Sequence, residues 1–467
     1  MEQKQYIEIR NTLRDIIKGT QWEGHVFVVG GCVRDEIMGL EIKDIDMVID
    51  MPNGGIRFVE WMHDNGYTMH SPVVYEGFGT AMFQLKDFPQ VELECVQTRK
   101  EKYPDRSIRN PKVVHGTIED DSLRRDLTIN SLDINISTGK LVDVTGHGVD
   151  DIKNHVIRTP LDPDETYDDD PLRILRCIRF ASRYGWDIDP ETYEGMKRNV
   201  HRLEIISQER KRDELDKMLT CKHPVMAMEL LRDTGAMHYV IPELEETYAM
   251  TQNSYHNGTV WEHSMQVLGQ IDSADLTLRM AAMLHDVGKV VTRTETDGGK
   301  VHFIGHETQS ARMAEDILRR LKYPLDFMRK VKFLVKHHMM TKHWGDDLTG
   351  MKDKHLRKLQ YLCKTEVRFR ELMLLIDADN KSHAPESCMP RQAQLIMERT
   401  AEMKAEGSAM FGFKLPFTGD EIMRLKQLPQ GPAVKECLDY LLKIAFVTPL
   451  LDKETWTKHL MGYKPNE

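Results

Sequence analysis

Two aspartates that lie two residues apart, Asp44 and Asp46, fall in the apolar segment DIDMVID and could bind a metal ion. Side chains alternate along a β-strand, so both carboxylates face the same side if this segment is a strand. Adjacent carboxylates repel each other unless a cation lies between them, and Mg²⁺ is the natural candidate. A strand-end pair that brackets a loop is the alternative. The flanking apolar residues and Lys43 favour the metal-binding interpretation.

An adjacent glycine pair, Gly30-Gly31, ends the apolar run HVFVV and precedes Arg34 in a segment expected to begin a helix. Such glycines let backbone N–H groups approach a polyphosphate, and the dipole of a helix N-terminus favours the negative charge. On its own, a Gly-Gly turn between a strand and a helix is more often only a turn. The aspartate pair in the next apolar segment shifts the balance toward phosphate binding.

Asp170 and Arg173 lie one helical turn apart in a helical pattern and could read the edge of a base. The spacing places both on one helix face, where the carboxylate presents acceptors beside the donors of the guanidinium. Such a pair can discriminate bases by bidentate hydrogen bonds, as nucleotide selection without a template requires. An i,i+3 salt bridge is the alternative and the usual meaning of this spacing.

Together these groups suit nucleotidyl transfer, in which a 3′-hydroxyl attacks an α-phosphate in line. Two metal ions held by carboxylates can lower the pKa of the hydroxyl and neutralise the charge that develops on pyrophosphate. This chemistry needs two or three acidic ligands on rigid strands, and Asp44, Asp46 and Glu94 can supply them.

A second group of polar residues is distributed over the second half of the chain. It comprises His263, His285-Asp286, Lys289, His306, the pair His337-His338, and Asp377 in the apolar segment LLIDAD. A single histidine on an apolar face is usually a packed core residue, but a His-Asp doublet with further histidines before and after it indicates more. Imidazoles and carboxylates that converge from helices suit one or two transition metals or Mg²⁺.

The elements that must position these groups change character along the chain. Residues 25–145 mix short β-rich runs with turns marked by glycine and proline, which predicts an α+β region. From Asp151 onward, apolar residues recur at three- and four-residue spacing, beginning with Leu172, Leu175 and Ile178. This periodicity predicts helices for the remainder of the chain.

Composition limits the class of protein. At 467 residues the chain is expected to form about two to four folding units. No apolar run approaches the ~20 residues that span a bilayer, and the polar N-terminus lacks a signal-peptide core. Seven cysteines scattered singly suit a reducing cytoplasm and argue against a thiolate zinc site. The net charge of −10 opposes nucleic-acid binding. Local clusters of Lys and Arg would nevertheless suit RNA capture. An ordinary solvated helix face explains any one of these clusters equally well.

The first 240 residues resemble a known family. GGCVRDEIMGLEIKDIDMVI resembles the signature of the polymerase-β superfamily enzymes that include CCA-adding tRNA nucleotidyltransferases and bacterial poly(A) polymerases, of the bacterial–eukaryotic class. ECVQTR is similar to the strand that supplies a third carboxylate, which implies Glu94, with Glu92 on the same face as the alternative. RRDLTINS resembles the family motif RRDxTxNA, whose arginines and polar groups meet the ribose and triphosphate, and DDPLR resembles the neck motif Glu-Asp-x-x-Arg. The nucleotide-binding set implied is Gly30, Gly31, Arg34, Arg124, Arg125, Asp126, Asn130, Asp169, Asp170, Arg173 and Arg176.

The resemblance also bears on the substrate. Asp169 stands where the family usually has glutamate, so the charge is kept on a shorter side chain. The segment EGFGT is close to the FGT of CCA-adding members, and Tyr103 to Val113 resembles a loop that full CCA-adding enzymes keep. CCA addition from CTP and ATP to tRNA is therefore the leading expectation. Specialised A or C addition follows, and poly(A) polymerase is third.

The second half resembles the HD phosphohydrolase superfamily, with the pattern H…HD…D. That likeness implies His263, His285, Asp286 and Asp377 as metal ligands, with His306 and either His337 or His338 adding a second metal. By this likeness a hydroxide on the bound metal would attack phosphorus, with Lys289 stabilising the phosphoryl oxygens. The expected metal is divalent, and its identity is left open. Two functional interpretations remain: an active transferase head with an HD domain that trims or repairs RNA ends, or a phosphohydrolase whose head only binds RNA.

The predicted architecture is an α+β protein with a small mixed sheet in a polymerase-β-like head, followed by all-α domains. The expected domains are a catalytic head (1–150), a helical neck that selects nucleotide and binds RNA (151–240), an HD domain (241–385) and a helical tail (386–467). The expected cofactor of the head is Mg²⁺, and the expected partners are tRNA, CTP and ATP in the cytoplasm.

Overall fold

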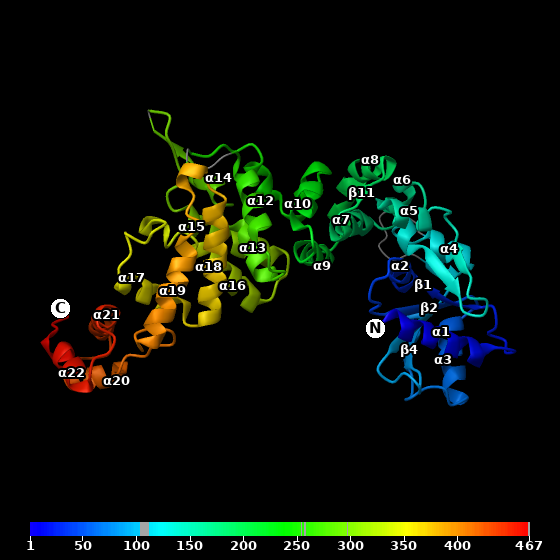
Figure 1. The fold of residues 1–467 in the computed structure, drawn as a ribbon, viewed down its shortest axis with the longest axis horizontal. Coiled ribbons are helices and arrows are strands. Elements are labelled where there is room, and N and C mark those ends of the chain that lie inside the picture. Colours follow the sequence, from blue (N-terminus) through cyan, green and yellow to red (C-terminus); the bar gives the residue numbers. More distant parts are fainter. Residues whose placement is uncertain (103–111, 254, 256–257, 297, 466–467) are drawn as a thin grey trace. The chain divides into compact units, whose positions relative to one another are not determined.

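The computed structural model describes residues 1–467 except 103–111, 254, 256–257, 297 and 466–467. The chain divides into two compact units, Met1–Pro242 and Glu243–Glu467 (Figure 1). The first unit carries the mixed sheet and the second is almost entirely helical, which confirms the predicted α+β class.

The head is a seven-stranded sheet in the order β3-β4-β5-β2-β1-β8-β9. Its strands are β1 (Val26–Val29), β2 (Ile45–Ile49), β3 (Val73–Tyr75), β4 (Thr80–Gln84), β5 (Glu92–Gln97), β8 (Leu132–Asn135) and β9 (Leu141–Asp143). The sheet is mixed, because β2 and β5 run parallel whereas β1 is antiparallel to both β2 and β8. A separate hairpin joins β6 (Arg99–Lys102) to β7 (Lys112–His115). The predicted loop from Tyr103 lies largely outside the described residues.

Helices complete the head: α1 (Gln3–Ile17), α2 (Gly31–Ile37), α3 (Gly54–Asp64) and α4 (Ile118–Leu123), with a 3₁₀ turn at Thr128–Asn130. The start of α3 lies directly on the sheet, since a Cβ added at Gly55 would be 2.8 Å from the backbone of Val96. Glycine there lets the helix approach β5 closely. β1 and β2 lie inside the sheet, between β5 and β8, and the site residues are at or near their ends.

The helical neck follows within the same unit. Its elements are α5 (Gly148–Asn154), α6 (Pro163–Asp169), α7 (Leu172–Tyr184), α8 (Pro190–Asn199), α9 (Gln208–Leu219), α10 (Pro224–Asp233) and α11 (Met237–Val240), with short parallel strands β10 (Val156–Ile157) and β11 (Asp187–Ile188). The apolar residues that predicted a helix from Leu172 onward, including Leu175 and Ile178, are buried in α7. That same helix carries four arginines, which places charged groups beside the core.

The second unit is helical apart from the short hairpin of β12 (Thr294–Glu295) and β13 (Val301–His302). Its helices are α12 (Val260–Gln270), α13 (Leu276–Leu284), α14 (Lys289–Thr292), α15 (His306–Arg320), α16 (Leu325–His337), α17 (Asp353–Cys363), α18 (Glu366–Lys381), α19 (Gln392–Ala405), α20 (Gly419–Lys426), α21 (Pro432–Val447) and α22 (Lys453–Gly462). The last three helices share a core of their own around Ile422, Leu441 and Trp456. None of the described helices combines the length and the apolar character needed to cross a membrane.

Candidate functional site

A polar cavity of about 590 Å³ lies in the first unit, between the sheet of the head and the helices α7 and α9. This volume falls within the range of small-molecule sites, roughly 300–1,000 Å³. The lining residues include Gly30, Gly31, Arg34, Asp46, Glu94, Arg99, Arg124, Arg125, Asp126, Asn130, Asp170, Arg173, Arg176 and Arg210. Residues far apart in the sequence thus meet in one cavity that is lined by several arginines and by carboxylates.

The carboxylates come from two neighbouring parallel strands. Asp46 of β2 and Glu94 of β5 are register partners, so their side chains stand beside each other on one face. Burial raises the pKa of Asp46, the nearby Glu94 raises it further, and Arg125 opposes both effects. Asp44 precedes β2, is exposed and is not among the residues that line the cavity, although its charge also raises the pKa of Asp46. The alternative Glu92 is exposed at the start of β5 and is not among the residues that line the cavity.

Arg125 explains why Gly30 must be glycine. Its guanidinium donates to the backbone carbonyl of Asn130 at 3.2 Å and to the carboxylate of Asp121 at 3.0 Å. The buried Asp133 lies 3.8 Å away on the other side. A Cβ at Gly30 would be 2.6 Å from Nη1 of Arg125, and the φ of +70° at Gly30 also favours glycine. The glycine therefore makes room for an arginine that lines the same cavity as Asp46 and Glu94.

A continuous network links the head to α7. Arg34 donates to the Asn130 side chain at 2.5 Å, and Asn130 donates to Asp126 at 2.9 Å. Asp126 in turn accepts from Arg176 of α7 at 2.7 Å. Although burial opposes ionisation, Arg176 and Asn130 hold the pKa of Asp126 below its ordinary value. These residues form one side of the cavity and fix the orientation of its donors.

The proposed base-reading pair is arranged differently from an i,i+3 salt bridge. Asp170 accepts from the backbone N–H of Leu172 at 3.1 Å and from Arg210 of α9 at 2.8 Å. Arg173 instead donates to the backbone carbonyls of Thr166 and Arg124 and lies 3.8 Å from Asp169. Asp170 and Arg173 therefore line the same cavity without pairing through their side chains. Arg210 lines the cavity but was not part of the nucleotide-binding set expected from the sequence.

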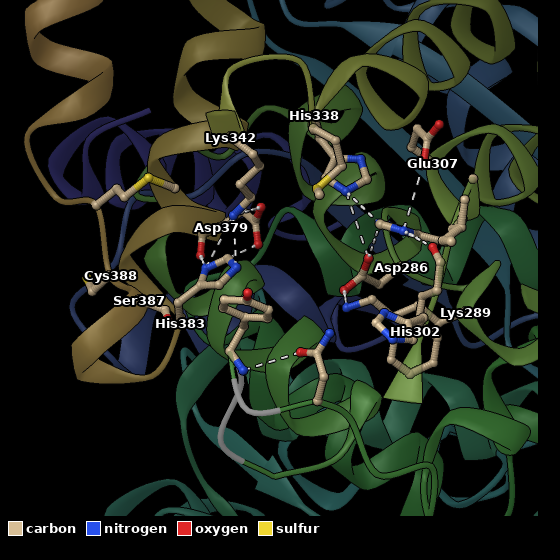
Figure 2. A pocket seen from close by; sticks show the side chains of 18 of the residues that line it. Asp286, Lys289, His302, Glu307, His338, Lys342, Asp379, His383, Ser387 and Cys388 are labelled. Carbon is tan, nitrogen blue, oxygen red and sulfur yellow. Dashed lines mark hydrogen bonds and ion pairs between the residues drawn. The ribbon is translucent and has the colours of Figure 1, made fainter. Parts of the chain in front are cut away.

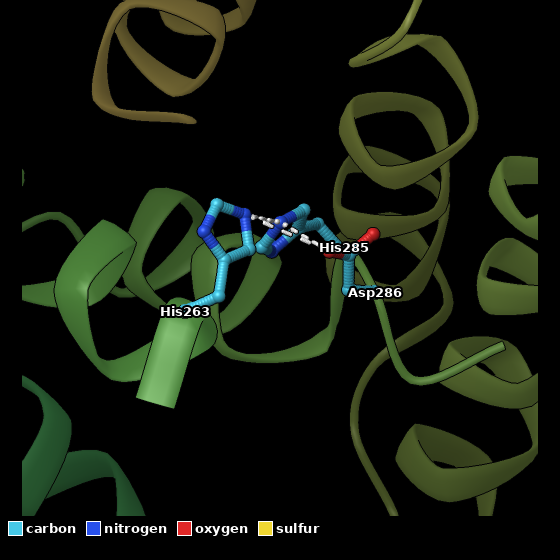
Figure 3. A group of neighbouring side chains, drawn as sticks. All are labelled: His263, His285 and Asp286. Atoms are coloured by element: carbon cyan, nitrogen blue, oxygen red, sulfur yellow. Dashed lines mark hydrogen bonds and ion pairs between the residues drawn. The ribbon is translucent and has the colours of Figure 1, made fainter. Parts of the chain in front are cut away.

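A second cavity, of about 730 Å³, lies in the second unit beside a buried group of histidines and aspartates. The group consists of His263 on α12, His285 and Asp286 after α13, His306 on α15, His338 after α16, and Asp379 on α18, each no more than 6% exposed. Two sets of three have ligand atoms within 4.8 Å of one another, His263-His285-Asp286 and Asp286-His306-His338. Figure 3 shows the first set, and Figure 2 shows the cavity with Asp286, His338 and Asp379 around it.

Backbone carbonyls fix the protonation of the four imidazoles. The Nδ1 atoms of His263, His285, His306 and His338 lie 3.3, 2.8, 2.9 and 2.7 Å from carbonyl oxygens of Ser382, Ala282, Phe303 and Val335. A carbonyl only accepts, so each Nδ1 carries a proton, and in the neutral imidazole each Nε2 presents a lone pair. Burial, with the neighbouring histidines, lowers the pKa of His338 to about 3 and keeps that imidazole neutral.

The lone pairs point at other acceptors. Nε2 of His263 lies 3.0 Å from Oδ1 of Asp379, and Nε2 of His306 lies 3.2 Å from Oδ1 of Asp286. Within the described part of the chain, this Asp286 oxygen is buried without a hydrogen-bond donor. Acceptors that converge in a buried space are stable only with a cation between them. The donor set of imidazoles and carboxylates therefore fits a divalent metal ion.

Two of the ligands expected from the sequence, Asp377 and His337, lie outside this group, and His338, the other histidine left open, lies within it. Asp377 is half-buried and pairs with Lys381 at 2.6 Å, whereas Asp379 is the carboxylate that meets His263. Residues two positions apart on an α-helix point in directions that differ by about 200°, so only one of Asp377 and Asp379 can face the histidines. His337 is likewise outside the group, with Nδ1 against the carbonyl of Phe333, and His338 takes its place. The apolar segment LLIDAD did not distinguish its two aspartates.

The fold and the cavity of the first unit define a nucleotidyltransferase head joined to a helical domain with a histidine-aspartate centre. Residues 26–158 match the family described as "Poly A polymerase head domain", residues 185–247 match "Probable RNA and SrmB- binding site of polymerase A", and residues 254–381 match "HD domain". The chain is 30% identical to the A-adding tRNA nucleotidyltransferase of Deinococcus radiodurans over 88% of this chain and 89% of the relative. It is also 30% identical to the Multifunctional CCA protein of Nitrosospira multiformis, over 74% and 81% of the two chains.

Solved structures share the fold. The CCA-adding enzyme of Bacillus stearothermophilus in complex with CTP superposes with a TM-score of 0.63 at 19% identity, over 93% of this chain and 92% of that one. The chain belongs to the family of tRNA nucleotidyltransferases and poly(A) polymerases, with an HD domain following the head and neck.

Proposed function

We propose that this protein adds C, C and A to the 3′ end of tRNA from CTP and ATP without a nucleic-acid template. The observation that carries the proposal is the cavity in which Asp46 and Glu94 stand beside Arg125, Asp126 and Arg173. Relatives named for CCA addition support the substrate, and the structure of one such enzyme contains CTP. The A-adding relative makes addition of A alone the alternative.

The carboxylates of the head fit Mg²⁺. Burial and the charge of Glu94 raise the pKa of Asp46, and a bound cation would stabilise its ionised carboxylate. Asp44, Asp46 and Glu94 would hold the metal, and bound Mg²⁺ would lower the pKa of the attacking hydroxyl and neutralise the pyrophosphate. Arg125 and Arg124 would bind the triphosphate, and Arg34 and Asn130 would hold Asp126 in place. Asp170 and Arg173 would read the base from the opposite wall.

The test is incubation of the purified protein with tRNA that lacks its 3′ end, Mg²⁺, and each nucleoside triphosphate separately or together. Products that grow by three nucleotides only with CTP and ATP support CCA addition. Growth by one residue with ATP alone, on tRNA that already ends in CC, indicates the A-adding alternative. Long tails of A would favour poly(A) synthesis, and the absence of extension would favour an RNA-binding head.

Variants of the carboxylates test the assignment of the metal site. Asp44→Ala or Asp46→Ala is expected to abolish nucleotide addition, because the metal ligands serve the transfer step. The matched control is Glu92→Ala, since Glu92 lies on β5 outside the lining of the cavity. A melting curve and the metal content of the second unit should be unchanged in all three variants. Near-normal addition by both aspartate variants would refute the assignment.

A second function is proposed for the HD domain, a metal-dependent phosphohydrolase. It is carried by the four Nε2 lone pairs and two carboxylates that converge on buried space. His263, His285, Asp286 and Asp379 would hold one metal ion, and Asp286 with His306 and His338 would hold another. The metal would supply a hydroxide for attack on phosphorus. Lys289, whose ammonium lies 2.6 Å from Asp286, would stabilise the phosphoryl oxygens.

Removal and return of metal tests this second function. The purified protein is treated with chelator, and hydrolysis of phosphomonoesters and 2′,3′-cyclic phosphates is measured before and after addition of Mg²⁺, Mn²⁺, Co²⁺, Ni²⁺ or Zn²⁺. Hydrolysis that follows the metal content supports the proposal and identifies the metal. A protein that binds no divalent metal in the second unit would refute it.

A further inference from the structure

The ammonium of Lys342 is held by three acceptors at the edge of the histidine-aspartate centre. Its Nζ lies 3.0 Å from Oδ2 of Asp379, 3.2 Å from Oδ1 of Asn380 and 2.8 Å from Nε2 of His383. Figure 2 shows Lys342 and His383 on either side of Asp379. We infer that Lys342 is a positioning residue, which holds one oxygen of Asp379 so that the other faces the metal. The inference rests on the metal site proposed for the HD domain.

Asn380 is fixed by a buried polar network that reaches α19. Its Nδ2 donates to Oε1 of Gln392 at 3.0 Å, which leaves Oδ1 directed at Lys342. Gln392 in turn accepts from the Thr341 hydroxyl at 2.7 Å and donates to the carbonyls of Thr341 and Gly345. Thr341, Asn380 and Gln392 are fully buried. Because a satisfied buried network has one low-energy arrangement, Lys342 is presented in a single orientation.

His383 is the third acceptor of the Lys342 ammonium, and its ring has one tautomer. Its Nδ1 lies 2.6 Å from the carbonyl oxygen of Asp379, so Nδ1 carries the proton and Nε2 accepts from Lys342. The four imidazoles at the metal centre have the same tautomer, with their lone pairs aimed at the metal position. In His383 the lone pair is instead used by the ammonium, so His383 orients the lysine and is not counted among the metal ligands.

The three N–H bonds of Lys342 are thus matched by three fixed acceptors, and only one of these is a metal ligand. Oδ2 of Asp379 is occupied by Lys342, whereas Oδ1 lies 3.0 Å from His263 and 3.8 Å from His285. The carboxylate therefore offers a single oxygen to the metal. Partners behind a metal ligand typically contribute about 10- to 100-fold to metal affinity. A role limited to stabilising the fold is the competing explanation.

The experiment compares Lys342→Met with Lys381→Met in the full-length chain. Lys381 lies on the same helix as Asp379 and pairs with Asp377 at 2.6 Å, so the control removes a neighbouring lysine–aspartate pair outside the centre. Each protein is stripped of metal and titrated with Co²⁺, whose visible absorption reports the number and geometry of ligands. Melting temperature and circular dichroism are measured on the same samples.

Lys342→Met is expected to bind Co²⁺ about 10- to 100-fold more weakly than the wild type, with an altered spectrum, whereas Lys381→Met matches the wild type. Wild-type affinity and spectrum in folded Lys342→Met would overturn the inference while leaving the metal site intact. Absence of Co²⁺ binding by the wild type would instead refute the metal site itself.

A second variant keeps the test decisive if Lys342→Met does not fold. His383→Ala leaves the partly buried Lys342 its two other acceptors, and is expected to weaken Co²⁺ binding by a smaller factor with the same direction of spectral change. Unchanged Co²⁺ binding by folded His383→Ala would count against the inference that His383 orients Lys342. His383→Gln, which restores an acceptor, is expected to recover part of the affinity.

Discussion

Gly30→Ala is the substitution whose effect can be worked out most directly. Gly30 has φ of +70°, and its added Cβ would lie 2.6 Å from Nη1 of Arg125. With a ψ of −124°, this backbone lies outside the left-handed helical region and costs about 1–3 kcal/mol for a residue with a side chain. The collision must in addition move Arg125 away from Asp121 and Asn130, the groups that hold it in the cavity.

The matched control is Gly39→Ala. Gly39 has a nearly identical φ of +69° but nothing within 4 Å of an added Cβ. Gly39→Ala should therefore lose roughly 1–2 kcal/mol in the free energy of unfolding, measured by urea denaturation, and Gly30→Ala should lose more because of the collision with Arg125. Only Gly30→Ala should damage nucleotide addition, because only there does Arg125 move.

The size of that loss follows from the interaction of Arg125 with the triphosphate. A hydrogen bond to a charged group contributes about 1.5–3 kcal/mol, which corresponds to ~10- to 100-fold in kcat/KM. The assay is single-nucleotide addition to tRNA at varied CTP, at a temperature where both variants are folded. If Gly30→Ala stays within about threefold of Gly39→Ala in kcat/KM, Arg125 does not depend on this glycine and the reasoning fails.

Three further predictions concern selectivity, independence of the two sites, and pH. Arg173→Ala is expected to relax selection of CTP and ATP over other nucleotides by ~10- to 100-fold, and a loss of stability without a change in selectivity would contradict base reading. His285→Ala combined with Asp286→Ala is expected to remove metal from the second unit and stop phosphoester hydrolysis, while kcat for addition at saturating tRNA persists in a folded variant. Burial raises the pKa of Asp133 from 3.8 to about 6, so its stabilising contribution is present below pH 3.8 and is lost as the pH rises through 6. Asp133→Asn should therefore flatten the fall in unfolding free energy between pH 4 and 7, and an unchanged pH profile would count against this assignment.

The head was predicted in most of its parts because its chemistry lies in contiguous motifs. The strand that carries Asp46 and the glycine pair at the start of α2 follow from local sequence, since strand alternation and glycine turns are short-range features. The pairing of β2 with β5, which sets Asp46 beside Glu94 and excludes Glu92 from the cavity, is a long-range contact. The sequence left these two glutamates as alternatives.

Long-range contacts also changed the meaning of charged pairs. Asp170 and Arg173 have the spacing of a helix salt bridge, yet Asp170 pairs with Arg210 and Arg173 donates to backbone carbonyls. The partner of Asp170 is 40 residues away on another helix, beyond the reach of a spacing argument. The same limit applies to Lys342, which the sequence did not mark and which only the packing of the turn after α16 against α18 brings to Asp379.

By itself the sequence determined the residue types of both centres, the order of the α+β head and the helical remainder, and the class of reaction. Those features depend on local periodicity and on motifs whose members are close in the chain. The tertiary structure decided which of two neighbouring residues serves the second centre, Asp379 over Asp377 and His338 over His337. In each pair both residues satisfy the apolar, helical pattern, and about 100° or 200° of helix rotation decides which one faces the centre. That rotation is set by packing against helices from distant parts of the chain, which no local pattern records.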